Sequence, residues 1–371
     1  MNQRPRVLLL IPHLGGGGAE RVMALVARGL SREKYELHLG LITQTDAACA
    51  ERPSGVALHA LGASRVRNAA LRLIRLVRIV KPDLILSGMF HLNFLVLMLR
   101  PFFPSGTRIL IRQNTTVSSS LALDGLPSFT RPLYKLLYRH ADRVVCQSRA
   151  MAADLAQELG LGPESLSVLP NPVDVEEIRS SIRKEPRRGS GSCLHLFAVG
   201  RLSREKGFDL LLQALVLVRV RFPGIGLVIA GAGPEEKALK MQCHQLGLDQ
   251  AVEFVGLVDQ PYRYFPNATL FVLSSRHEGL PNALLEAAAA GLPIVAVPSS
   301  QGVVDLLRGQ PGAWLAREIS APALAATLLS AMETLRPSER FAYSFVDEFR
   351  FDRAIPAYER LIDATLGEKQ S

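Results

Sequence analysis

Short apolar runs alternate with amphipathic helical patterns along almost the whole chain. The runs that predict strands are Arg6–Ile11, Glu36–Ile42, Leu84–Leu86, Arg108–Ile111, Arg143–Cys146 and Leu166–Leu169 in the first half, and Leu194–Val199, Gly226–Ala230, Val252–Val255, Leu270–Leu273 and Ile294–Val297 in the second. Helices are predicted between them, among others over Ala19–Leu30, Ser148–Leu159, Phe208–Arg221, Pro234–Leu246 and Asn282–Gly291. Strands without polar alternation that are separated by helices are typical of parallel sheets covered on both faces. The pattern therefore predicts an α/β protein.

The same pattern occurs twice and predicts two Rossmann-like domains in tandem. We expect an N-terminal domain over residues 1–175, a polar, glycine-rich linker over 176–192, and a second domain over 193–344. The helical pattern that follows, 345–371, is expected to pack back on the first domain. Ligands of such folds bind beyond the carboxyl ends of the strands, so the site is predicted in a cleft where the two domains face each other.

The composition, with 48% hydrophobic and 21% charged residues in a chain of 371, is that of an ordinary globular protein. It excludes disorder, collagen-like repeats and coiled coils. Four widely spaced cysteines without a CxxC pair exclude a structural zinc site and a disulfide framework. The first apolar run is too short for a signal peptide, and the apolar stretch Leu84–Leu99 is shorter than the ~20 residues of a membrane-spanning helix. We therefore expect a cytoplasmic protein.

The net charge of +9 lies entirely within the first 175 residues, which indicates an anionic partner for that half. The segment Arg65–Lys81 predicts an amphipathic helix. One side carries Arg65, Arg72, Arg75 and Arg78, and the other carries Ala70, Leu73, Ile74, Val77 and Val80. An ordinary helix packed on its sheet explains the pattern, yet its basic face would attract anionic lipid at the inner face of the cell membrane. Nucleic acid is not expected, because no recognition motif is present and aromatic residues make up 6% of the chain.

The first predicted strand ends at His13 and is followed by four glycines, Gly15–Gly18, before a helix begins. Glycines at such a turn let the backbone approach a ligand closely, and amides at the helix start face an anion. Gly16 and Gly17 are therefore candidates for binding an anionic ligand; a tight strand-to-helix turn is the alternative, but such a turn rarely needs four glycines. His13 is a weaker candidate for contacting a bound substrate such as an acceptor, because a packed, hydrogen-bonded histidine explains its position better.

The second domain opens in the same way, with Arg201 and Lys206 between a strand and a helix. A guanidinium and an ammonium at this position would suit a diphosphate and stabilise it as a leaving group. Two solvated surface cations are the alternative. The concentration of positive charge at a loop where ligands bind favours the functional interpretation.

A third loop follows the predicted strand Leu270–Leu273 and leads into a helix that Pro281 can start. Gly279 and Leu280 would leave amides pointing outward at the helix start. Glu278 lies just before the helix and Glu286 lies two turns into it. Carboxylates accept hydrogen bonds from sugar hydroxyls, so these groups together with the two cations describe a nucleotide-sugar site. Taken singly, each carboxylate could instead be a solvated or helix-capping residue.

At these residues the chain resembles glycosyltransferase family 4, whose members are retaining enzymes of the GT-B fold. The resemblance covers nearly the whole chain. It rests on Gly-Gly-x-Glu-Arg after the first strand, Gly200-Arg201-x4-Lys206-Gly207, Glu278-Gly-Leu-Pro-x4-Glu286, and Pro170-Asn171-Pro172-Val173-Asp174 at the domain junction.

The resemblance implies that Arg201 and Lys206 hold the donor's phosphates, Glu278 the transferred sugar and Glu286 the ribose. It also implies that the Gly16, Gly17, Gly279 and Leu280 amides complete the cradle. The segments that contain Gly233 and Val258 would flank the base of a UDP- or GDP-sugar. The acceptor is expected to be a lipid-linked or cell-surface glycan.

One departure from the family concerns the strand that ends in Arg112-Gln113-Asn114, where many members have a histidine. Arg112 and Asn114 remain candidates for binding the acceptor, without an assigned catalytic histidine. The chain also has no Asp-x-Asp pair, so we predict transfer without a metal or other cofactor. A nucleotide-sugar epimerase and a non-catalytic nucleotide-sugar-binding protein stay open as alternatives.

Overall fold

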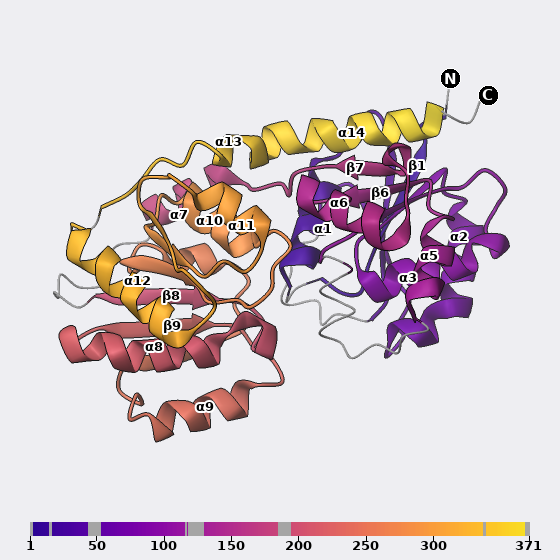
Figure 1. Cartoon of the computed structure of the whole chain (residues 1–371). Helices are drawn as coiled ribbons and strands as arrows, with labels where there is room; N and C mark the ends of the chain where they lie inside the picture. The colour runs from indigo at the N-terminus through magenta and orange to yellow at the C-terminus, as the bar shows by residue number, and fades with distance from the viewer. Residues whose placement is uncertain are drawn as a thin grey trace. The chain divides into compact units, whose positions relative to one another are not determined.

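The structure of the chain is a computed structural model that describes residues 3–14, 17–43, 53–115, 117, 130–184, 194–336 and 339–367. The chain divides into two compact units (Figure 1). Unit 1 comprises Met1–Pro172 together with Phe351–Ser371, and unit 2 comprises Val173–Arg350. Unit 1 is therefore assembled from two segments that are far apart in the sequence.

Unit 1 is built on a seven-stranded parallel sheet with the strand order β3-β2-β1-β4-β5-β6-β7. Its strands are β1 (Arg6–Ile11), β2 (Glu36–Leu41), β3 (Ala57–Ala60), β4 (Leu84–Ser87), β5 (Arg108–Arg112), β6 (Arg143–Cys146) and β7 (Leu166–Val168). Its helices are α1 (Gly18–Gly29), α2 (Ala70–Val80), α3 (Phe90–Leu99), α5 (Thr130–Tyr138), α6 (Arg149–Leu159) and α14 (Phe351–Gly367), with 3-10 turns η1 (Val66–Ala69), η2 (Arg100–Phe102) and η3 (Pro163–Ser165).

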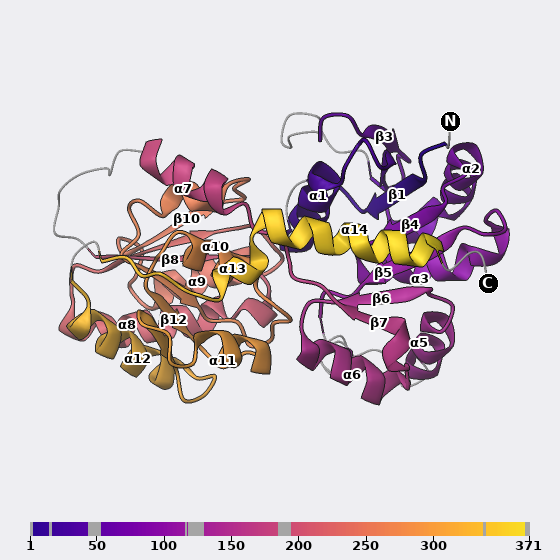
Figure 2. The ribbon, with the colours of Figure 1, turned by 90° about the horizontal axis from the view of Figure 1, so that it is seen from above.

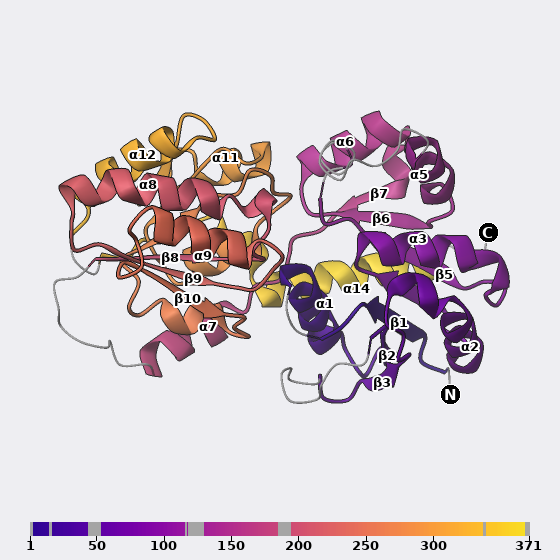
Figure 3. The same cartoon turned by 90° about the horizontal axis from the view of Figure 1, so that it is seen from below.

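Side chains of the central strands alternate between two apolar cores, as the pleat of a strand requires. In β1, Leu8 and Leu10 pack in the core that α2, α3, α5 and α6 cover. Leu9 and Ile11 point the other way, into the core that α1 and α14 cover. Figure 2 shows α14 lying across the strands on its face, and Figure 3 shows α3 between α2 and α5 on the opposite one. Helices thus cover both faces of the sheet.

Unit 2 repeats this arrangement on a six-stranded parallel sheet with the order β10-β9-β8-β11-β12-β13. Its strands are β8 (His195–Val199), β9 (Gly226–Ala230), β10 (Val252–Gly256), β11 (Leu270–Leu273), β12 (Ile294–Ala296) and β13 (Ala313–Leu315). Its helices are α7 (Val175–Lys184), α8 (Phe208–Arg221), α9 (Glu236–Gln245), α10 (Asn282–Ala289), α11 (Gln301–Leu307), α12 (Ala321–Thr334) and α13 (Val346–Phe349), with turns η4 (Arg204–Lys206) and η5 (Pro261–Tyr264). One core lies under α8, α9 and α12, and the other under α7, α10, α11 and α13.

The segment predicted as a linker over 176–192 is in part a helix. Helix α7 begins at Val175, and Val175 and Ile178 are buried in a core of unit 2. The carboxylate of Asp174 accepts a hydrogen bond from the backbone N–H of Glu177 at 2.9 Å, which satisfies a free amide of the first turn. The many charged residues on the exposed side of this helix obscured its apolar face in the sequence. The remainder of the predicted linker, 185–192, lies outside the described residues.

The apolar stretch over 84–99 divides into strand β4 and helix α3, which pack in the same core. None of the helices in the described ranges combines the length and the low polarity that crossing a bilayer requires.

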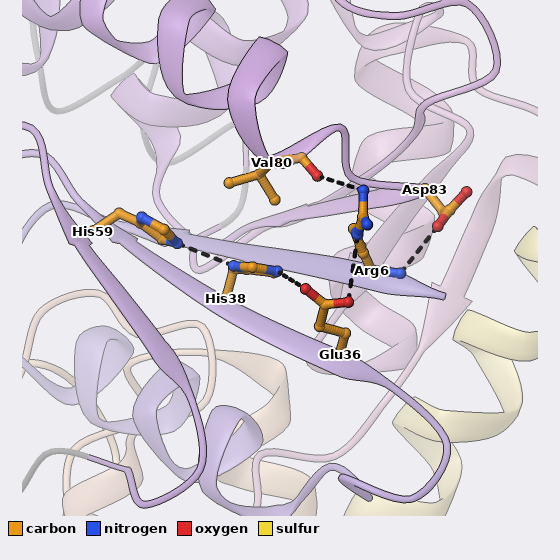
Figure 4. Close-up of polar contacts among 6 residues, drawn as sticks. All are labelled: Arg6, Glu36, His38, His59, Val80 and Asp83. Atoms are coloured by element: carbon orange, nitrogen blue, oxygen red, sulfur yellow. Dashed lines mark hydrogen bonds and ion pairs between the residues drawn. The ribbon is translucent and has the colours of Figure 1, made fainter. Parts of the chain in front are cut away.

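A chain of ionisable side chains runs across β1, β2 and β3 on one face of sheet 1 (Figure 4). His59 Nε2 lies 3.0 Å from His38 Nδ1, and His38 Nε2 lies 3.1 Å from the Glu36 carboxylate. Glu36 also accepts a hydrogen bond of 3.4 Å from Arg6 Nε, and its pKa is lowered because these partners outweigh the effect of burial. Burial, and secondly the charge of His38, lowers the pKa of His59 below its ordinary value. The folded chain therefore favours neutral His59.

A lowered histidine pKa makes stability depend on pH with a definite sign. The unfolded chain binds the His59 proton more readily, so the free energy of unfolding falls as the pH falls through the ordinary histidine value of about 6.5. We expect the loss of stability between pH 7.5 and pH 5.5 to be smaller for His59→Gln than for the unsubstituted chain. Urea unfolding at both pH values measures this. His91→Gln, the same substitution at an exposed histidine, is measured alongside as the control.

Candidate functional site

The loops that follow β8, β9 and β10 come very close together at the carboxyl edge of sheet 2. The backbone N–H of Gly231 donates to the Gly256 carbonyl at 2.7 Å, and that of Leu202 donates to the Ala232 carbonyl at 3.0 Å. A Cβ on Gly231 would lie 1.9 Å from the Gly200 carbonyl oxygen, and one on Gly233 would lie 2.4 Å from the Leu202 carbonyl oxygen. Glycine at these positions is therefore required for the approach of two backbones, apart from any contact that Gly233 makes with a ligand.

Lys206 and Glu278, from the loops after β8 and β11, form an ion pair at this edge. Lys206 Nζ lies 2.7 Å from Glu278 Oε1, and the side chains are 23% and 9% exposed. Burial acts to lower the pKa of Lys206, but the charge of Glu278 and its hydrogen bond prevail, so the pKa is raised. The lysine is therefore held as a cation beside a carboxylate that is shielded from water.

Further candidates lie in the same two loops or in helix α10, which follows the second of them. Arg201 is exposed, and its guanidinium has no partner among the described residues. Gly279 and Leu280 lie just before α10, and their backbone N–H groups likewise donate to no other group in the described part of the chain. Glu286 is buried within α10. Free amides at a helix start and a free guanidinium suit an anionic ligand.

Val258, the remaining candidate in unit 2, lies two residues beyond β10 and packs against the core under α10. The fold thus brings all the candidates of unit 2 to the carboxyl ends of four neighbouring strands: Arg201, Lys206, Gly233, Val258, Glu278, Gly279, Leu280 and Glu286. Their predicted contacts with a donor stay predictions.

Arg276 fastens the loop after β11 to the loop after β8, a role that we did not assign from the sequence. Its guanidinium makes two hydrogen bonds of 2.7 Å to the Asp209 carboxylate and one of 2.8 Å to the Arg204 carbonyl. Its backbone N–H donates to the Glu205 carbonyl at 2.7 Å. The Asp209 pKa is lowered, because the bonds from Arg276 outweigh burial. These contacts fix the segment that carries Lys206. The sequence feature that could have indicated this role is the position of Arg276, three residues after the buried strand β11.

We expect Arg276→Lys to reduce kcat/KM for the donor by about tenfold, because a lysine cannot bind the Asp209 carboxylate through two parallel hydrogen bonds. The reduction should appear mainly in kcat, since Arg276 positions Lys206, the cation expected to stabilise the leaving diphosphate. Arg263, whose Nε donates to the Gln260 side chain at 2.7 Å on the surface, provides the control substitution Arg263→Lys. Steady-state kinetics with varied donor compares the two. Equal kinetic constants for Arg276→Lys and Arg263→Lys would show that Arg276 does not position Lys206.

In unit 1, the turn after β1 brings His13 close to Glu20. His13 Nε2 lies 3.7 Å from Glu20 Oε1, and Glu20 is buried in the first turn of α1. A Cβ on Gly17 would meet the Glu20 carboxylate at 2.1 Å, so the glycine leaves room for that side chain. Gly16 lies outside the described residues. Glu20 belongs to the motif after the first strand but was not assigned a role from the sequence.

Arg112 and Asn114 belong to a buried polar network at the carboxyl edge of sheet 1. Arg112 is fully buried and donates to the side chains of Asn114 and Asn171. The Asn114 oxygen also accepts from Gln147 at 3.1 Å, and its NH₂ group donates to the Gly88 carbonyl. The Asn114 amide therefore has protein partners on both sides. The structure gives Arg112 and Asn114 an internal, positioning role, and their contact with an acceptor remains a prediction.

Comparison with known families places this fold and these loops among sugar-transferring enzymes. Residues 16–177 match the family model described as Glycosyltransferase Family 4, and residues 183–344 match the model described as Glycosyl transferases group 1. The two matches together span most of both units. The chain therefore belongs to the family 4 glycosyltransferases and is itself a glycosyltransferase, as the sequence motifs indicated.

Individual relatives agree with this assignment. The chain is 29% identical to an N-acetylgalactosamine-N,N'-diacetylbacillosaminyl-diphospho-undecaprenol 4-alpha-N-acetylgalactosaminyltransferase of Campylobacter jejuni, over 80% of this chain and 82% of that protein. It is 30% identical to a putative colanic acid biosynthesis glycosyltransferase of Salmonella typhimurium, over 53% of this chain and only 49% of that protein. The crystal structure of Anabaena Alr3699/HepE in complex with UDP and glucose superposes with a TM-score of 0.78, at 18% identity, over 97% of this chain and 100% of that one. The predicted GT-B fold class is thereby confirmed.

Proposed function

We propose that the chain transfers a sugar from a UDP- or GDP-sugar to a hydroxyl group of a lipid-linked or cell-surface glycan, in polysaccharide or lipopolysaccharide biosynthesis. The observation that carries the proposal is the Lys206–Glu278 pair. The same unit holds the Arg201 guanidinium and the amides before α10, which have no partner among the residues that the structure describes. The relatives support it, since one acts on a diphospho-undecaprenol glycan and a solved neighbour binds UDP and glucose.

The proposed reaction proceeds with retention of the anomeric configuration. Arg201 and Lys206 stabilise the diphosphate as the bond between the sugar C1 and the phosphate oxygen breaks. Glu278 accepts hydrogen bonds from the transferred sugar, and Glu286 accepts them from the ribose. The acceptor oxygen then bonds to C1 on the same face, and its proton passes to the leaving diphosphate. Because the two cations neutralise the diphosphate, no metal is required.

Thermal stabilisation by UDP, GDP, ADP and their sugar conjugates tests the donor site first, because a ligand that binds the folded chain raises its Tm. A shift confined to one nucleoside diphosphate would identify the donor class. Acceptor-dependent release of that nucleotide, unchanged by a metal chelator, would then show transfer. Release without an acceptor, or none at all with any glycan, would favour the epimerase or the binding protein.

Peripheral attachment to the inner face of the cell membrane is part of the same proposal. Helix α2 buries Leu73, Val77 and Val80 and exposes Arg75 and Arg78, as the amphipathic pattern predicts. Exposed arginines near an anionic bilayer each contribute about 1 kcal/mol of binding free energy. The attachment would place the enzyme at the surface that carries a lipid-linked acceptor.

A further inference from the structure

Three helices of unit 1 end at the amino-terminal edge of sheet 1, away from the loops of the candidate site. Helices α2, α3 and α5 run back along the sheet and are followed by the first residues of β4, β5 and β6. Helix α3 contacts both α2 and α5, and Figure 3 shows it between them. The ends of these helices therefore form one continuous edge of unit 1.

This edge exposes large apolar side chains. Met98 is 57% exposed, Phe102 53% and Leu136 58%, and Ile79 at the end of α2 is exposed as well. Single exposed apolar residues are ordinary, but several at the ends of neighbouring helices mark an interaction surface. We refer to Ile79, Met98, Arg100, Phe102 and Leu136 as the amino-edge surface.

A groove of about 720 Å³ opens beside these residues between the end of α3 and the end of α5. Its apolar wall includes Leu97, Met98, Phe103 and Leu137, and its polar lining includes Arg100 and Arg108. An apolar trough with cations at one side has the chemistry of a site for an anionic amphiphile.

The two arginines share one carboxylate. Asp142 lies 3.1 Å from Arg100 Nη1 and 2.8 Å from Arg108 Nη1, and it also accepts from the backbone N–H of Ile109 at 2.8 Å. The Nε of Arg108 is buried without a hydrogen-bond partner among the described residues. Two arginines against one carboxylate leave the groove with a net positive charge. Asp83 is the one acidic residue in the sequence between Arg65 and Arg112, so this part of the chain supplies almost no compensating negative charge.

We propose that the amino-edge surface binds an anionic glycerophospholipid of the bilayer. Acyl chains enter the groove against Leu97 and Leu137, and the phosphate binds Arg100 and Arg108. The lipid-linked acceptor is the less suitable occupant. Its reacting hydroxyl is needed at the carboxyl edge, about 17 Å away across the five residues of β5. The inference rests on the proposed membrane attachment and names its surface and its ligand.

Binding to vesicles tests the proposal with the whole chain. We expect sedimentation with vesicles of phosphatidylglycerol and phosphatidylcholine, and little with phosphatidylcholine alone. The triple variant Met98→Asp, Phe102→Asp, Leu136→Asp should bind the anionic vesicles at least about thirtyfold more weakly. The control is Val220→Asp, Met241→Asp, which changes two apolar residues of unit 2 that are even more exposed; this variant should bind like the unsubstituted chain.

Two further variants test the headgroup and the depth of insertion. Arg100→Gln leaves Asp142 paired with Arg108, and we expect it to weaken binding to anionic vesicles about fivefold. Phe102→Trp adds a reporter to a chain whose one tryptophan, Trp314, lies in unit 2. Phosphatidylglycerol with brominated acyl chains should quench the new fluorescence and leave that of the unsubstituted chain unchanged.

Equal binding of the triple variant and the unsubstituted chain would overturn the proposal. Equal binding to neutral and anionic vesicles would do the same, as would an absence of quenching in the Phe102→Trp variant.

Failure of the proposed function gives a different result. If no donor and acceptor pair supports transfer while the vesicle results are as expected, the lipid site stands and the activity does not. Where transfer is found, the triple variant should keep its rate with a detergent-dispersed acceptor and lose it with the acceptor in vesicles.

Discussion

Replacing Lys206 with alanine is expected to lower the rate of sugar transfer by about a thousandfold while the chain remains folded. The lysine lies 2.7 Å from Glu278 and is held as a cation at the site where the diphosphate is proposed to bind. Removing it would take away the charge that stabilises the leaving group. Glu278→Ala is expected to be as severe, because it removes both the proposed sugar contact and the partner of Lys206. Initial rates with the identified donor measure both effects.

A matched ion pair separates this role from the general effect of losing a salt bridge. Lys240 and Glu236 form a pair of the same length, 2.7 Å, on the surface of α9. Lys240→Ala should leave transfer unchanged. Stability gives a second comparison, since Lys206→Ala leaves a shielded carboxylate unpaired and the double variant removes both charges. The double variant should therefore unfold at a higher urea concentration than Lys206→Ala. Normal turnover by Lys206→Ala would disprove the site assignment.

Gly207→Ala is expected to destabilise the chain by roughly 3 kcal/mol and to lower transfer by at least about tenfold. Gly207 has a φ of +64°, and a Cβ there would lie 2.1 Å from the Ser274 carbonyl oxygen. Backbone must move to admit the methyl group, and the residue that moves with Gly207 is Lys206. The Ser274 hydroxyl also donates to the Lys206 carbonyl at 2.9 Å, so the displacement would break a second contact between these loops.

Gly247 is the control that separates the effect of the close contact at Gly207 from the effect of its positive φ. Its φ of +65° is nearly the same, but a Cβ there would have no atom within 4 Å. Gly247→Ala should therefore cost only about 1 kcal/mol, the strain of a left-handed alanine, and should leave transfer unchanged. Urea unfolding and initial rates of both variants check this. Similar losses for the two would mean that the approach of Gly207 to Ser274 has no separate effect.

The sequence was sufficient to locate most of the sheets, because buried parallel strands are continuous apolar runs. β1, β6, β9 and β11 have the bounds that were predicted, and the other predicted strands differ by one residue at one end. Two edge strands were missed. β3 is half-exposed and reads Ala-Leu-His-Ala, and β13 has three residues, so neither shows a long apolar run. The helical pattern after residue 344 divides into α13 and α14, because the chain leaves the helical conformation at Arg350.

The candidate site was predicted best where a side chain follows a strand directly. Lys206 and Glu278 were both assigned to the phosphate and sugar site, and the structure places them in contact. The role of Arg276 could not be read from the sequence, because its partner Asp209 lies 67 positions away and only the fold brings the two loops together. The sequence also did not indicate that Arg112 is buried. Arg112 was proposed to contact an acceptor, but it has no exposed surface.

The division of unit 1 between two distant segments has a consequence for how the protein is made on the ribosome. Ile355, Tyr358 and Ile362 of α14 complete the core that also holds Val26 and Tyr35. Residues of α14 are synthesised only after the whole of unit 2, which takes roughly ten seconds or more at ordinary rates of translation. During that interval the nascent first segment has an uncovered apolar face, a surface for chaperones to protect. A message truncated before codon 351 would make that exposure permanent, and its product would be a substrate for proteolysis.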